Sequence, residues 1–115
     1  MLNSRLTLLA VALAFCGTAS AADADAAMAL MRQNNCLKCH HMEKEKEAPP
    51  FKKIAAKYQG KADAEAKLLK HLTTSPKVKL ADGTEEEHKV IQTKPPKDEA
   101  QVRNVVQFIL SQGAK

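Results

Sequence analysis

Two cysteines followed directly by a histidine, in Cys36-Leu37-Lys38-Cys39-His40, constrain this chain more than any other feature of its sequence. A thioredoxin-like redox site would place such a Cys-x-x-Cys pair in a βαβ context, and no residues near Cys36 alternate like a strand. A zinc site would usually need four ligands, and no second Cys or His pair appears downstream. A third possibility for this spacing is covalent haem attachment, in which each thiol adds to a vinyl group of a haem and the histidine binds the iron. The pattern therefore predicts one covalently attached haem c, held by Cys36 and Cys39, with His40 as an iron ligand.

The first 21 residues have the pattern of a secretory signal peptide. A single positive charge precedes an apolar run from 6 to 15, and Ala19-Ser20-Ala21 places small residues where signal peptidase cuts. The run is too short to span a bilayer core of about 30 Å. Cys16 follows the bulky Phe15, whereas a lipid-attachment cysteine follows a small residue. We therefore expect export with cleavage after Ala21, and no stable insertion into the membrane afterwards.

The rest of the chain, residues 22–115, has room for one domain. The whole sequence has 115 residues, of which 44% are hydrophobic, and this size excludes two large modules. Once the signal is removed, Cys36 and Cys39 are the remaining cysteines, and a disulfide between them would close no useful loop. We expect these two thiols to serve the haem.

Apolar spacing predicts an all-α domain of four helices. The last helix shows it most clearly, because its apolar residues between 102 and 110 repeat with a period near 3.6. The expected helices cover residues 24–33, 50–58, 63–73 and 98–111. The polar segment 74–97 alternates on both sides of Asp82-Gly83, which predicts a short hairpin there.

Four stretches of the chain, CLKCHH, APPFKKIAAKY, KADAEAKLLKHL and DEAQVRNVVQFILSQ, resemble the small monohaem class I cytochromes c of bacterial periplasms. The resemblance implies the class I cytochrome c fold, with about four helices around one covalent haem and the first and last helices crossing beside it. Met31 and Phe108 fall at that crossing. The resemblance also implies that the carbonyl of Pro49 accepts a hydrogen bond from Nδ1–H of His40, which fixes the tautomer of the ligand.

The second axial ligand of the iron is less obvious. The family that the chain resembles normally supplies a methionine in the loop before the last helix, and this chain has no methionine after Met42. Lys94 precedes two prolines, as the family's methionine often does, but an amine with an ordinary pKa of about 10.4 must first lose a proton. An imidazole is in general largely neutral at pH 7 and ready to bind a metal, so we expect His88 as the distal ligand, with Lys94 and an open or water-bound site as alternatives. His71, among the lysines of the third helix, is expected at the surface.

These features predict a periplasmic carrier of single electrons. Haem iron with both axial positions filled can change between Fe(III) and Fe(II) but cannot bind a substrate. The chain shows no acid–base pair or nucleophile tied to a pocket, so we expect no enzyme activity. An open sixth site would instead permit gas-binding or peroxidase-like chemistry. The same haem would also suit the electron-entry subunit of a periplasmic oxidoreductase.

The charge pattern favours protein partners over nucleic acid. The formal net charge is +5, but acidic residues are mixed among the lysines and aromatic residues make up 3% of the chain. Lys38, Lys52 and Lys53 lie near the haem motif in sequence and could form a basic rim. Such a rim would speed encounter with acidic redox donor and acceptor proteins. Lysines kept for solubility would give the same pattern.

Overall fold

The protein's structure, a computed structural model, describes residues 21–114. The expected signal peptide falls on residues 1–21, so all of it except Ala21 lies outside the described residues, as does Cys16. The boundary between signal and mature domain therefore stays a prediction. Within residues 21–114, no helix combines the length and the hydropathy that crossing a membrane requires.

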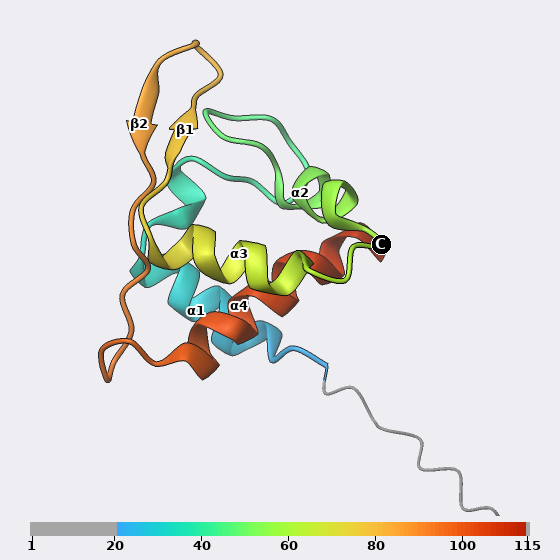
Figure 1. The fold of residues 1–115 in the computed structure, drawn as a ribbon, viewed down its shortest axis with the longest axis vertical. Helices are drawn as coiled ribbons and strands as arrows, with labels where there is room; N and C mark the ends of the chain where they lie inside the picture. Colours follow the sequence, from blue (N-terminus) through green and yellow to red (C-terminus); the bar gives the residue numbers. More distant parts are fainter. Residues whose placement is uncertain (1–20, 115) are drawn as a thin grey trace, which may run out of the picture.

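Four α-helices and one two-stranded hairpin make up the described chain (Figure 1). The elements are α1 (Ala24–Gln33), α2 (Phe51–Tyr58), α3 (Ala64–Thr73), β1 (Lys77–Lys79), β2 (Glu85–Glu87) and α4 (Glu99–Ser111), with short 3-10 turns at Cys36–Lys38 and Gln112–Ala114. Each helix begins within one residue of its predicted start and ends at its predicted last residue. The prediction of an all-α domain with four helices is confirmed.

Aspartates cap the first and last helices and explain where these begin. Asp23 precedes α1, and its carboxylate accepts a hydrogen bond from the backbone N–H of Ala26 at 3.0 Å. Asp98 precedes α4 and accepts one from Ala100 at 3.1 Å. The first N–H groups of a helix have no partner within the helix, so these carboxylates satisfy them. The prediction began the last helix one residue early because it counted the cap as helical.

The crossing of α1 and α4 forms the centre of the hydrophobic core (Figure 1). Met31 of α1 and Val106 of α4 are fully buried, and Phe108 belongs to the same cluster. Helices α2 and α3 both pack against α4 and add Phe51 and Leu68 to this core. Met31 and Phe108 therefore lie at the crossing, as expected.

The chain between α3 and α4 folds as the predicted hairpin followed by an extended segment. β1 and β2 pair antiparallel, with Val78 opposite Glu86. Gly83 in the turn has a φ of 87°, a left-handed conformation that glycine adopts without steric penalty. After β2, residues 88–93, which we call the distal strap, run past the C-terminal end of α1 (Figure 1).

Two methionines of α1 provide a test of this core. Met31→Ala removes a fully buried side chain, and such a truncation costs about 2–5 kcal/mol of unfolding free energy because it leaves a cavity. Met28→Ala removes a half-buried side chain from the same helix and should cost clearly less. Denaturant unfolding of the two variants measures both losses. Equal losses would contradict the central position of Met31 in the core.

Candidate functional site

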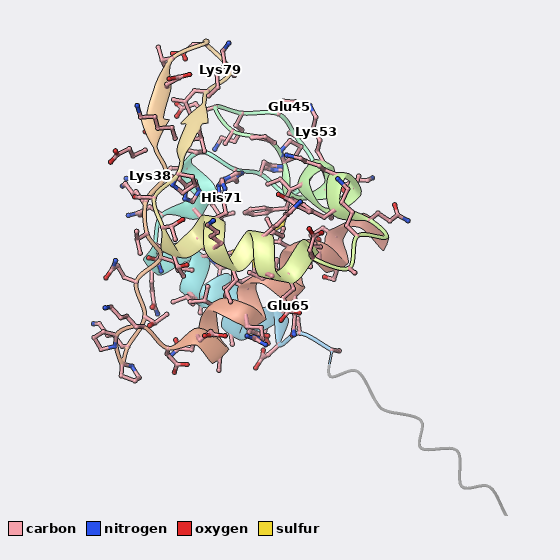
Figure 2. The ribbon with its side chains drawn as sticks, in the orientation of Figure 1. Lys38, Glu45, Lys53, Glu65, His71 and Lys79 are labelled. Atoms are coloured by element: carbon pink, nitrogen blue, oxygen red, sulfur yellow. The ribbon has the colours of Figure 1, made fainter. Side chains whose placement is uncertain are left out.

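A cavity of about 750 Å³ lies between the cysteine-histidine motif, α2, α3, the hairpin and the distal strap. Figure 2 shows His71 on the side of α3 that faces the motif and the hairpin. Much of the cavity wall is apolar, and its members include Met31, Phe51, Ile54, Leu68, Leu72, Leu80, Val105 and Ile109. The cavity is large enough for a planar organic cofactor and offers it a mainly apolar surface.

The motif enters the cavity wall through a tight turn. The backbone N–H of His40 donates to the carbonyl of Cys36 at 3.0 Å, and Asn35 takes a left-handed conformation just before the turn. Cys36, Cys39 and His40 all line the cavity as a result. Burial raises the pKa of the Cys36 thiol. Burial and then the hydrogen bond to Glu47 raise the pKa of Cys39, whereas the reactive cysteines of redox catalysts have lowered pKa values.

The ring of His40 is oriented by a backbone carbonyl and an aromatic ring. Its Nδ1 lies 2.6 Å from the carbonyl oxygen of Pro49, which can only accept a hydrogen bond, so the proton is on Nδ1. The ring stacks on that of Phe51 with centres 5.0 Å apart. Burial lowers the pKa of His40, against the opposite effect of the bond to Pro49. His40 is therefore neutral near pH 7, and the lone pair of Nε2 is available to a metal.

His88 begins the distal strap and is held in a similar way. Its Nδ1 lies 2.9 Å from the carbonyl oxygen of Lys89, which again assigns a proton to Nδ1 and makes Nε2 the nitrogen that can bind a metal. Its backbone N–H donates to the carbonyl of Pro76 at 2.8 Å, and its carbonyl accepts from the hydroxyl of Ser75 at 2.6 Å. The hairpin thus returns the chain to a position where His88 lines the cavity.

The spacing of His40 and His88 fits two ligands on one iron. Their ring centres are 6.4 Å apart. A metal–imidazole bond is about 2.0 Å long, and the bonded nitrogen lies about 1.1 Å from the centre of its ring. If two imidazoles bind opposite sides of one ion, their ring centres are therefore about 6.2 Å apart. Together with the cavity volume, the arrangement fits a haem ligated by two histidines.

His71 is a cavity residue that the sequence analysis missed. It lies on α3, half-buried, with its ring centre 4.6 Å from that of His88. Burial first, and then the nearby His88, lower the pKa of His71. The expectation that His71 is an ordinary surface residue is wrong. The signal was present in the spacing, because His71 follows the buried Leu68 by three residues, which places both on neighbouring parts of one helix face.

Lys94, the alternative ligand, lies away from the cavity. Its side chain is exposed and does not contribute to the cavity wall. Its carbonyl accepts a hydrogen bond from the side chain of Gln101 at 2.9 Å, which ties this part of the loop to α4. The geometry therefore favours His88 over Lys94.

The charged residues at the cavity have both signs. Lys38 and Lys53 line it as expected, whereas Lys52 is exposed elsewhere on α2. Further charged residues that line the cavity are Lys57, Lys89, Glu86 and Glu87. Lys53 also pairs with Glu45 at 2.9 Å, and both side chains are largely exposed. The basic rim is thus partly balanced by glutamates.

Comparison with known proteins identifies consistent relatives. A family model, Cytochrome c, matches residues 24–113. The class 1 cytochrome MtoD from Sideroxydans lithotrophicus ES-1 is 53% identical, with a TM-score of 0.75 over 81% of this chain and 99% of that one. Wild-type cytochrome c552 of Nitrosomonas europaea is 26% identical, with a TM-score of 0.57 over 74% of this chain and 98% of that one. No curated protein sequence matches the chain. These similarities confirm the resemblance and the class I cytochrome c fold.

Proposed function

The chain belongs to the cytochrome c family of electron carriers, and we propose that it is a periplasmic single-electron carrier in which His40 and His88 ligate the iron. Family membership means that the chain holds one covalent haem c. When bound, this haem supplies an iron that changes between Fe(III) and Fe(II). In our proposal Cys36 and Cys39 hold it through thioether bonds. Pro49 orients His40 and keeps its proton on Nδ1.

The separation of the His40 and His88 rings carries this proposal. At 6.4 Å between centres, with both Nδ1 atoms bonded to carbonyls, the two rings are prepared to act as opposed ligands. Two histidine ligands would leave no open position on the iron for a substrate, which favours electron transfer over gas binding or peroxidase-like chemistry. An imidazole in place of the usual methionine also lowers the reduction potential, because methionine ligation raises it.

The first prediction concerns attachment and export. We expect the exported protein to have the mass of residues 22–115 plus one haem, and no thiol that reacts with a thiol reagent after unfolding. Intact-mass spectrometry and thiol titration measure both. Cys36→Ala with Cys39→Ala should give a protein that retains no haem under denaturing conditions. Two free thiols in haem-replete protein would contradict thioether attachment, and a mass that includes the first 21 residues would contradict cleavage.

The second prediction concerns the sixth ligand, for which the cavity offers a matched pair of histidines. His88→Ala should convert the oxidised protein from low spin to high spin and open the iron to carbon monoxide when reduced. His71→Ala should keep the low-spin spectrum, because His71 contacts His88 and is not assigned to the iron. Optical and electron paramagnetic resonance spectra measure both. The reverse pattern would transfer the ligand role to His71. Lost low-spin character in Lys94→Ala would transfer it to Lys94.

The third prediction concerns the basic rim. Lys38 lines the cavity and Lys52 does not, although both carry the same charge. If positive charge near the haem steers anionic partners, Lys38→Gln should slow oxidation of the reduced protein by ferricyanide by about twofold at low salt. Lys52→Gln should have a smaller effect. Stopped-flow rates over a range of ionic strength measure this, and identical rates for both variants would reject steering by the rim.

A further inference from the structure

The distal strap is attached to the rest of the protein on two sides. On one side it is joined to the end of α3 and the chain that follows: the N–H of His88 donates to the carbonyl of Pro76, and the N–H of Ile91 donates to the carbonyl of Leu72 at 2.9 Å. On the other side it meets the C-terminal end of α1, two residues before Cys36 (Figure 1). His88 is part of this strap, so both attachments bear on the position of the proposed distal ligand.

One side chain, Asn34, makes the attachment on the α1 side. Its Oδ1 accepts a hydrogen bond from the backbone N–H of Gln92 at 2.7 Å, and its Nδ2 donates to the carbonyl of Gln92 at 3.0 Å. The same Nδ2 donates to the carbonyl of Leu30 at 2.9 Å, which fixes the amide against its own helix. Asn34 therefore pairs with the strap as a neighbouring strand would, through one donor and one acceptor.

We propose that Asn34 is a positioning residue that holds the distal strap against the haem-attachment segment and so slows the release of His88 from the iron. The inference rests on the proposed ligation by His88. Because the thioether bonds of Cys36 and Cys39 join this segment to the haem, Asn34 ties the strap to the side of the molecule where the haem is anchored. Without Asn34, the strap keeps its bonds to Leu72 and Pro76 and the burial of Ile91 in the core, but it loses its hydrogen bonds to the end of α1.

The chain contains a matched control for this role. Asn104 on α4 makes the same two-bond pairing with the backbone of Asp23, accepting from its N–H at 2.8 Å and donating to its carbonyl at 2.9 Å. That pairing joins the start of α1 to α4 and contributes nothing to the cavity wall. Asn34→Ala and Asn104→Ala each remove one such pair, and the pair made by Asn34 lies on the distal strap. Asn34→Ala also removes the bond from Nδ2 to the carbonyl of Leu30 within α1.

The experiment measures carbon monoxide binding to the reduced, haem-loaded protein by stopped flow. Carbon monoxide reaches the iron only after His88 leaves, so at high concentration the observed rate reaches a plateau equal to the rate of His88 release. We expect this plateau rate to rise by about tenfold in Asn34→Ala, the change produced by about 1.4 kcal/mol. Asn104→Ala should keep the wild-type plateau while losing a similar amount of stability in denaturant unfolding.

The possible outcomes separate the inference from the function on which it rests. Equal plateau rates in wild type, Asn34→Ala and Asn104→Ala, or an equal rise in both variants, would overturn the role of Asn34 and leave ligation by His88 intact. A wild-type protein that binds carbon monoxide as fast as His88→Ala would overturn the ligation itself. If Asn34→Ala fails to assemble with haem, Asn34→Asp keeps the acceptor and the side-chain shape but loses both donor bonds. Its plateau rate should also rise, and a wild-type rate would contradict the inference.

Discussion

The need to enclose one haem with a chain of 115 residues is the constraint on which the rest of the structure depends. The cavity of about 750 Å³ occupies much of the space that a small domain would otherwise fill with side chains. The core is therefore concentrated at the crossing of α1 and α4, and residues such as Phe51 and Leu68 serve both the core and the cavity wall. A bound haem covers the apolar wall of the cavity and so removes it from water. Haem binding and folding therefore stabilise each other.

Backbone carbonyls decide which nitrogen each cavity histidine presents. Pro49 and Lys89 accept from Nδ1 of His40 and His88, so in both rings Nε2 is the nitrogen that can bind a metal. Burial acts in the same direction at His40, because it lowers the pKa and keeps the ring neutral. In the proposed site both Nε2 atoms are thus presented to the iron, and within residues 21–114 no charged side chain is bonded to either ring.

Asparagine side chains join segments that are far apart in the sequence. Asn34 pairs with the backbone of Gln92, 58 residues away, and Asn104 pairs with Asp23 at a separation of 81. In each case the amide satisfies one N–H and one carbonyl that lie outside regular helices and strands, which would otherwise depend on water. These polar pairings supplement a small apolar core at the two ends of α1.

The sequence by itself determined the four helices, the hairpin and the cofactor, because each depends on residues that are close together along the chain. The helices follow from apolar spacing, the hairpin from Asp82-Gly83, and the haem from five consecutive residues. Tertiary structure decided which residues share the cavity. His71 lies at the boundary between the buried and exposed faces of α3, and the strap that covers it is placed by long-range contacts. The 6.4 Å between His40 and His88 likewise arises from how the hairpin returns the chain, since a spacing of 48 residues fixes no distance.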